Sequence, residues 1–128
     1  MAGTTICMKA EKQISLEAIY KKICIIEGIE QISKTTQTIN DVTIWTLVYE
    51  KYYFRTGSYA SATIVLTEYE QNQTACIVSS GGGVGVVNFS FGSNRKSASE
   101  YVQILESCGF CIVESDMKDK GFVDRFFK

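Results

Sequence analysis

Histidine and proline are both absent from the 128-residue sequence. Without imidazole the chain lacks the commonest general base, the usual activator of a serine or cysteine nucleophile, and the usual nitrogen ligand of catalytic zinc. Chemistry based on carboxylates, lysine, tyrosine or thiols is still open to it. Because proline is missing, glycine, asparagine and aspartate are left to mark the turns.

Neither an excess of charge nor a long apolar run is present. Thirteen basic and fourteen acidic residues give a net charge of −1, so no overall field draws the protein to a polyanion. No apolar stretch approaches the roughly 20 residues that span a bilayer, and residues 1–9 lack the basic segment and long apolar run of a secretion signal. We therefore expect a cytoplasmic protein that binds neither nucleic acid nor membranes.

The composition, 45% hydrophobic and 21% charged, is that of one ordinary globular domain. We expect a single domain over residues 1–128, and the sequence leaves open the state of the tail 116–128, which mixes charges with phenylalanines. A chain of this length buries about two thirds of its surface on folding. It therefore needs neither a disulfide nor a metal to fold, and we expect no cofactor.

The first half of the chain alternates between strand and helix patterns. Residues 3–10 favour a strand, and Ser15 then stands where a helix N-cap belongs. Apolar residues at three- and four-residue intervals follow up to Ile26, so the spacing predicts an amphipathic helix that Gly28 closes. From about residue 30 to 80 the period changes to two, which predicts four strands joined by hairpins. The turn signals are Asn40-Asp41, Thr56-Gly57 and Gln71-Asn72.

The second half continues with one more strand, a helix and a final strand. Residues 86–91 favour a strand, and Ser97 with Glu100 forms a capping box ahead of a helix that ends at Gly109. Residues 110–114 then favour a strand. Short connections and this order predict an α+β fold, a mostly antiparallel sheet in β-α-β-meander-α-β order with both helices packed on one face.

The two faces of the predicted sheet differ. In the strand 59–69, alanines, isoleucine and leucine share one face and are small enough to lie under a helix. The strand before it is bulky on both faces, with Trp45, Tyr49 and Tyr53 on one of them. Two helices cover only one face of a sheet. We therefore expect Trp45, Tyr49 and Tyr53 to lie on a face that the tail, a ligand or a second copy of the protein covers.

A run of glycines is the second candidate site. Gly81, Gly82, Gly83 and Gly85 leave backbone N–H groups free to converge on a phosphate or carboxylate, and Lys51 and Arg55 are the cations proposed to join them. The run lacks the third glycine of a dinucleotide fingerprint, and a strand rather than a helix follows it. A simple connection or bulge between two strands is the structural alternative.

The five cysteines offer one close pair, Cys108 and Cys111. This pair follows a helix, whose negative end disfavours a thiolate, and no second pair completes a zinc site. The remaining three, Cys7, Cys24 and Cys76, are isolated in the sequence and fit small buried positions. We therefore expect core cysteines with a glycine helix cap, and no metal.

Two classes of function follow. The first hypothesis is a non-enzymatic domain that binds, through its helix-free sheet face, a second copy of itself or a small ligand. The alternative is a small enzyme or an anion-binding protein that uses the glycine run 81–85. The segment Lys51–Arg55 interleaves base and ring as single-stranded nucleic-acid binders do, but strand alternation explains the same pattern.

Overall fold

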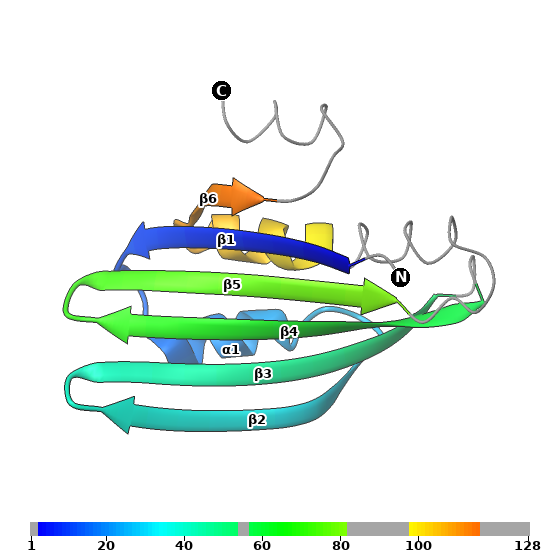
Figure 1. Ribbon diagram of the computed structural model, residues 1–128, viewed down its shortest axis with the longest axis horizontal. Coiled ribbons are helices and arrows are strands. Elements are labelled where there is room, and N and C mark those ends of the chain that lie inside the picture. The colour runs from blue at the N-terminus through cyan, green and yellow to red at the C-terminus, as the bar shows by residue number, and fades with distance from the viewer. Residues whose placement is uncertain (1–2, 54–56, 82–97, 116–128) are drawn as a thin grey trace.

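The structure is a computed structural model that describes residues 3–53, 57–81 and 98–115. The predicted strand 86–91 and the tail 116–128 lie outside these ranges. The described residues form six strands and two helices, arranged as Figure 1 shows. In chain order they are β1 Gly3–Glu11, α1 Leu16–Ile23, β2 Ile29–Ile39, β3 Val42–Tyr53, β4 Ser58–Tyr69, β5 Asn72–Gly81, a second helix over 98–107, and β6 Cys111–Ser115.

The six strands form one antiparallel sheet in the order β2-β3-β4-β5-β1-β6. The meander β2–β5 is confirmed, and Asn40 and Glu70 adopt positive φ in its turns. The first strand returns to pair with β5, and the last strand adds to β1 at the edge. The predicted α+β fold with a mostly antiparallel sheet is therefore correct.

Local capping residues set the start of α1 and the end of the second helix. Ser15 accepts a hydrogen bond from the backbone N–H of Ala18 at 3.1 Å, as predicted for an N-cap. The first helix ends at Ile23, earlier than expected, and tighter turns continue the chain to Gly28. The second helix ends in a Schellman motif: Gly109 has φ +97, and the N–H of Phe110 reaches the carbonyl of Leu105 at 3.0 Å.

The core lies between the sheet and the two helices, which cover the same face. In Figure 1 the strands lie in front of both helices. Alternate residues of the strands supply the sheet side of this core, as their period of two requires. Both helices supply the other side. The buried residues of the core, from the strands and the helices together, include Ile6, Met8, Leu16, Ile19, Ile23, Leu47, Ile64, Leu66, Ile77, Tyr101, Val102 and Leu105. No helix in the described ranges is long and apolar enough to cross a membrane.

The three aromatic residues expected on the helix-free face lie on the helix-covered side, so this expectation was wrong. Tyr49 is fully buried and stacks on Tyr101 of the second helix, with ring centroids 6.0 Å apart. The Tyr53 hydroxyl donates a hydrogen bond to Glu100 of the same helix. Trp45 lies 6.0 Å from the ring of Tyr20 in α1.

The strand register explains this correction. Tyr49 is directly opposite Ala62, and residues directly opposite in a strand pair share a face. The alanines of β4 leave space that the large rings of β3 fill. The aromatic face of β3 and the small-residue face of β4 are therefore one surface, and the helices cover both.

Candidate functional site

The opposite side of the sheet is covered by no element of the described ranges, and we call it the open face. Its residues on β2–β5 form what we call the central patch. Register places the following side chains there: Glu30, Ser33, Thr35, Gln37, Ile39, Val42, Ile44, Thr46, Val48, Glu50, Tyr52, Tyr59, Ser61, Thr63, Val65, Thr67, Tyr69, Asn72, Thr74, Cys76, Val78 and Ser80.

The central patch is almost free of charge. Glu30 and Glu50, which lie directly opposite each other near one end of the patch, are its two charged side chains, and threonine and valine are its commonest residues. The Tyr52 and Tyr59 rings meet edge to face, 5.0 Å apart. Tyr59 is 54% exposed and Tyr69 is 46% exposed. The patch therefore presents rings and methyl groups together with hydroxyls that can donate or accept hydrogen bonds.

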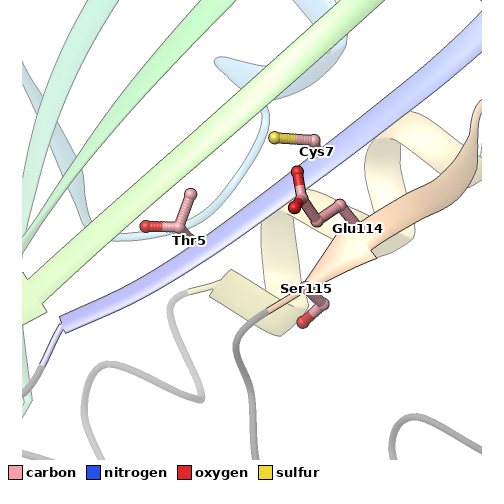
Figure 2. A pocket seen from close by; sticks show the side chains of 4 residues that line it. All are labelled: Thr5, Cys7, Glu114 and Ser115. Atoms are coloured by element: carbon pink, nitrogen blue, oxygen red, sulfur yellow. The ribbon is translucent and has the colours of Figure 1, made fainter.

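Charged residues return at the rim of the open face, on β1 and β6. Lys9 follows Thr74 across the sheet, and Glu114 of β6 lies opposite Cys7 of β1. A shallow cavity of about 230 Å³ opens there between Thr5, Cys7, Glu114 and Ser115. Figure 2 shows the Cys7 and Glu114 side chains on the same side of these two strands.

Cys7 and Cys76 are the residues that the sequence analysis missed. They are directly opposite each other on β1 and β5, and their Sγ atoms lie 3.8 Å apart. Both side chains are half-buried. Sixty-nine residues separate them in the chain, so no spacing motif could reveal the pair. The sequence predicts core cysteines, and Cys108 is buried as expected. Cys24 and Cys111 are exposed, so the prediction was wrong for these two.

Both edges of the sheet carry features that oppose pairing with another strand. On β2 the register shifts between Gln31 and Ser33, and Lys34 stands on this edge. On the other edge β6 is five residues long, and the register shifts between Cys7 and Met8 of β1. Bulges, lysines and short strands are devices that oppose edge-to-edge association.

The proposed anion site is only partly within the described residues. Ala60 lies opposite both Lys51 and Gly81, so the register places these two on one cross-strand row. Lys51 is already paired, with its Nζ 2.9 Å from Oε2 of Glu100. Arg55, Gly82, Gly83 and Gly85 lie outside the described ranges. An anion at this row would compete with Glu100 for the lysine.

Several polar groups lie on the helix-covered side. Burial raises the pKa of the hydroxyls of Tyr49 and Tyr101 far above their usual value. A hydrogen bond with Cys24 raises the pKa of Tyr20. Among the described residues the buried Tyr49 hydroxyl has no hydrogen-bond partner, and no three histidine, cysteine or acidic side chains cluster to hold a metal. The buried hydroxyls of Tyr49 and Tyr101 therefore hold their protons firmly.

Comparison with known proteins identifies a family. Residues 1–109 match the model of a family of unknown function, DUF6054, and the chain belongs to that family. The match includes all the strands of the central patch together with β1 and the second helix. No curated protein and no solved structure matches the chain.

Proposed function

We propose that this DUF6054 chain is a non-enzymatic domain that associates with a second copy of itself by stacking the two central patches. The observation that carries the proposal is that four neighbouring strands of an open sheet face have only two charged side chains in the described residues, Glu30 and Glu50, both near one end. Protein interfaces are depleted of charged residues at their centre and enriched in tyrosine. The central patch has both properties.

The area of the central patch suits a stable dimer. Four strands spaced about 4.8 Å apart, each some 11 residues long, cover about 19 Å by 35 Å. Two such patches bury roughly 1,300 Å² in total, which lies within the range of about 1,200–2,000 Å² for specific interfaces. A two-fold axis would place the same patch on both sides, which is the commonest symmetry of soluble oligomers.

The chemistry of the two sheet edges supports stacking over strand addition. The bulge in β2 and the shortness of β6 oppose edge pairing. Threonine and valine side chains on a pleated surface interdigitate when two sheets stack about 10 Å apart. Threonine hydroxyls can also hydrogen-bond across such a contact, so burial leaves few of them unsatisfied.

Sedimentation velocity of the full chain tests the proposal. We expect a dimer at micromolar concentration. Thr63 lies half-buried near the middle of the patch, and Thr63→Lys would bring two like charges together in a stacked dimer. We expect it to weaken association at least about 100-fold, or about 2.8 kcal/mol.

Thr38→Lys is the matched control, because Thr38 is an exposed threonine on the helix side of β2. It should leave association unchanged, and circular dichroism should show both variants folded. A wild-type monomer at roughly 200 µM, where a useful association would be populated, contradicts the proposal. So does equal weakening by both substitutions.

The alternative anion site has its own readout. Phosphate at about 10 mM should raise the melting temperature if the row of Lys51 and Gly81 takes an anion. Lys51→Ala should then abolish the increase. A monomer that phosphate stabilises in this way would replace the self-association proposal with the anion-binding one.

A further inference from the structure

The pair Cys7 and Cys76 has the geometry of a dithiol that can close. Directly opposite residues of an antiparallel pair have Cα atoms about 4.5–5.5 Å apart. This range lies within the roughly 4.4–6.8 Å that a disulfide spans. The Sγ atoms are 3.8 Å apart, so side-chain rotation with a small strand adjustment brings them to the bonding distance of about 2.05 Å.

One thiol of the pair is open to a small reagent. Cys7 lines the cavity of about 230 Å³ beside Glu114, and it stands on β1, outside the central patch. Cys76 lies directly opposite Cys7 on β5 and does not line this cavity. A reagent that enters this cavity meets Cys7 (Figure 2). Cys76, with its Sγ 3.8 Å from that of Cys7, is placed to react second.

The other cysteines have no such partner in the sheet register. Cys108 lies at the end of the second helix and is buried, with 4% of its surface exposed, and Cys24 follows α1. Cys111 is opposite Lys9. Within the described strands, Cys7 and Cys76 are the one directly opposite cysteine pair.

We propose that Cys7 and Cys76 form a redox-active site that exchanges with small organic disulfides. The Cys7 thiolate attacks one sulfur of the disulfide, forms a mixed disulfide and releases the first small thiolate. The Cys76 thiolate then attacks Sγ of Cys7 and releases the second. Two electrons pass from the protein to the reagent, the two thiol protons end on the two small thiols, and one Cys7–Cys76 bond forms.

Closure is reversible in this proposal. The strand pleat holds opposite Cβ atoms at about 4.5–5.5 Å, farther than the roughly 3.8 Å typical of disulfides, and a bond formed under such strain is more easily reduced. Excess small thiol should therefore reopen it. The site differs in this respect from a structural disulfide, which resists reduction by small thiols.

Oxidised glutathione is the probe, added to the reduced full chain, with intact mass as the readout. We expect a loss of about 2 Da, two hydrogen atoms, and a peptide that links Cys7 to Cys76. Reduced glutathione in excess should restore the starting mass. Cys76→Ser should stop the reaction at one glutathionyl group on Cys7, while Cys7→Ser should slow modification of Cys76 at least about tenfold.

Cys24→Ser is the control. It removes the exposed cysteine at the C-terminal end of α1 and should leave the Cys7–Cys76 bond unchanged. Glutathione on Cys24 or Cys111 with no Cys7–Cys76 bond overturns the proposal, as does a bond that excess reduced glutathione fails to open. Sedimentation of the same samples reports association separately. A wild-type monomer that still closes the bond would refute only self-association.

Discussion

The two faces of the sheet are made of alternate residues of the same strands but carry different kinds of side chain. The covered face holds large aliphatic and aromatic groups that the helices bury, such as Tyr49 and Ile64. The open face holds threonine, valine and serine, with tyrosines at both ends of β4. Stability should therefore depend on the first face and association on the second, and substitutions at neighbouring positions can separate the two.

The largest effect is expected from one pair of adjacent residues in β4. Ile64 is fully buried under the helices, whereas Val65 lies half-buried on the open face. Ile64→Ala should lower the free energy of unfolding by about 3–4 kcal/mol, through lost burial and the cavity left behind. Val65→Ala should cost about 1 kcal/mol or less. Urea unfolding at low protein concentration measures both, and equal losses would contradict the contrast.

The next largest effect is expected from alkaline pH, which should lower the free energy of unfolding through tyrosines of the covered face. Burial raises the pKa of Tyr49 and Tyr101 above the unfolded value of 10.0. The folded chain keeps these protons at pH values where the unfolded chain has lost them. Stability is therefore complete below pH 10 and falls above it, by about 1.4 kcal/mol per pH unit for each tyrosine.

Urea unfolding between about pH 9 and pH 11 measures this slope. Tyr101→Phe removes one of the two groups and should reduce the slope by about half. A slope identical to that of the wild type would show that the buried rings do not control the alkaline limit.

A smaller effect separates two tyrosine hydroxyls on the covered face. The Tyr53 hydroxyl donates to Glu100 at 2.9 Å, and Tyr53→Phe should cost about 1–2 kcal/mol because a bond to a charged group is lost. The Tyr49 hydroxyl is buried and has no partner among the described residues. Tyr49→Phe should therefore be neutral or stabilise by up to about 1 kcal/mol. Thermal unfolding of the two variants side by side decides this, and the reverse order would refute it.

Local signals predicted most of the fold correctly. Ser15 caps its helix, Gly109 ends the other, and the turn at Asn40-Asp41 lies where it was expected. The turn predicted at Gln71-Asn72 lies one residue earlier, at Glu70-Gln71. Each of these depends on contacts within a few residues, which a sequence pattern records directly. The predicted end of α1 at Gly28 was too late. Gly28 has the positive φ expected of a helix-ending glycine, but the helix ends at Ile23 and tighter turns lie between the two.

The assignment of the aromatic face failed although the sequence held the needed signal. A two-residue turn at Thr56-Gly57 would set Tyr53 opposite Ala60, and the four-residue connection in the structure sets it opposite Ser58. Both are even loop lengths, so both leave the rings of β3 on the same face as the alanines of β4. Loop parity therefore fixes which faces coincide, even where the exact register is unknown.

The thiol pair could not be predicted in the same way. It depends on β1 returning to pair with β5, a contact between residues 69 positions apart. Strand propensity gives no partner for such a pairing. Strand alternation shows only that Cys7 and Cys76 each share a face of their own strand with threonines. The pairing of β1 with β5 then places the two cysteines opposite each other.

A dilution series followed by methyl NMR tests the central claim most directly, because it reports both faces in one experiment. With association through the central patch, the methyl signals of Val48, Val65 and Val78 should shift with protein concentration. Those of Ile19, Ile64 and Ile77, which are fully buried in the core, should stay in place. Open-face signals that do not move up to millimolar concentration, or equal shifts on both faces, would contradict the account.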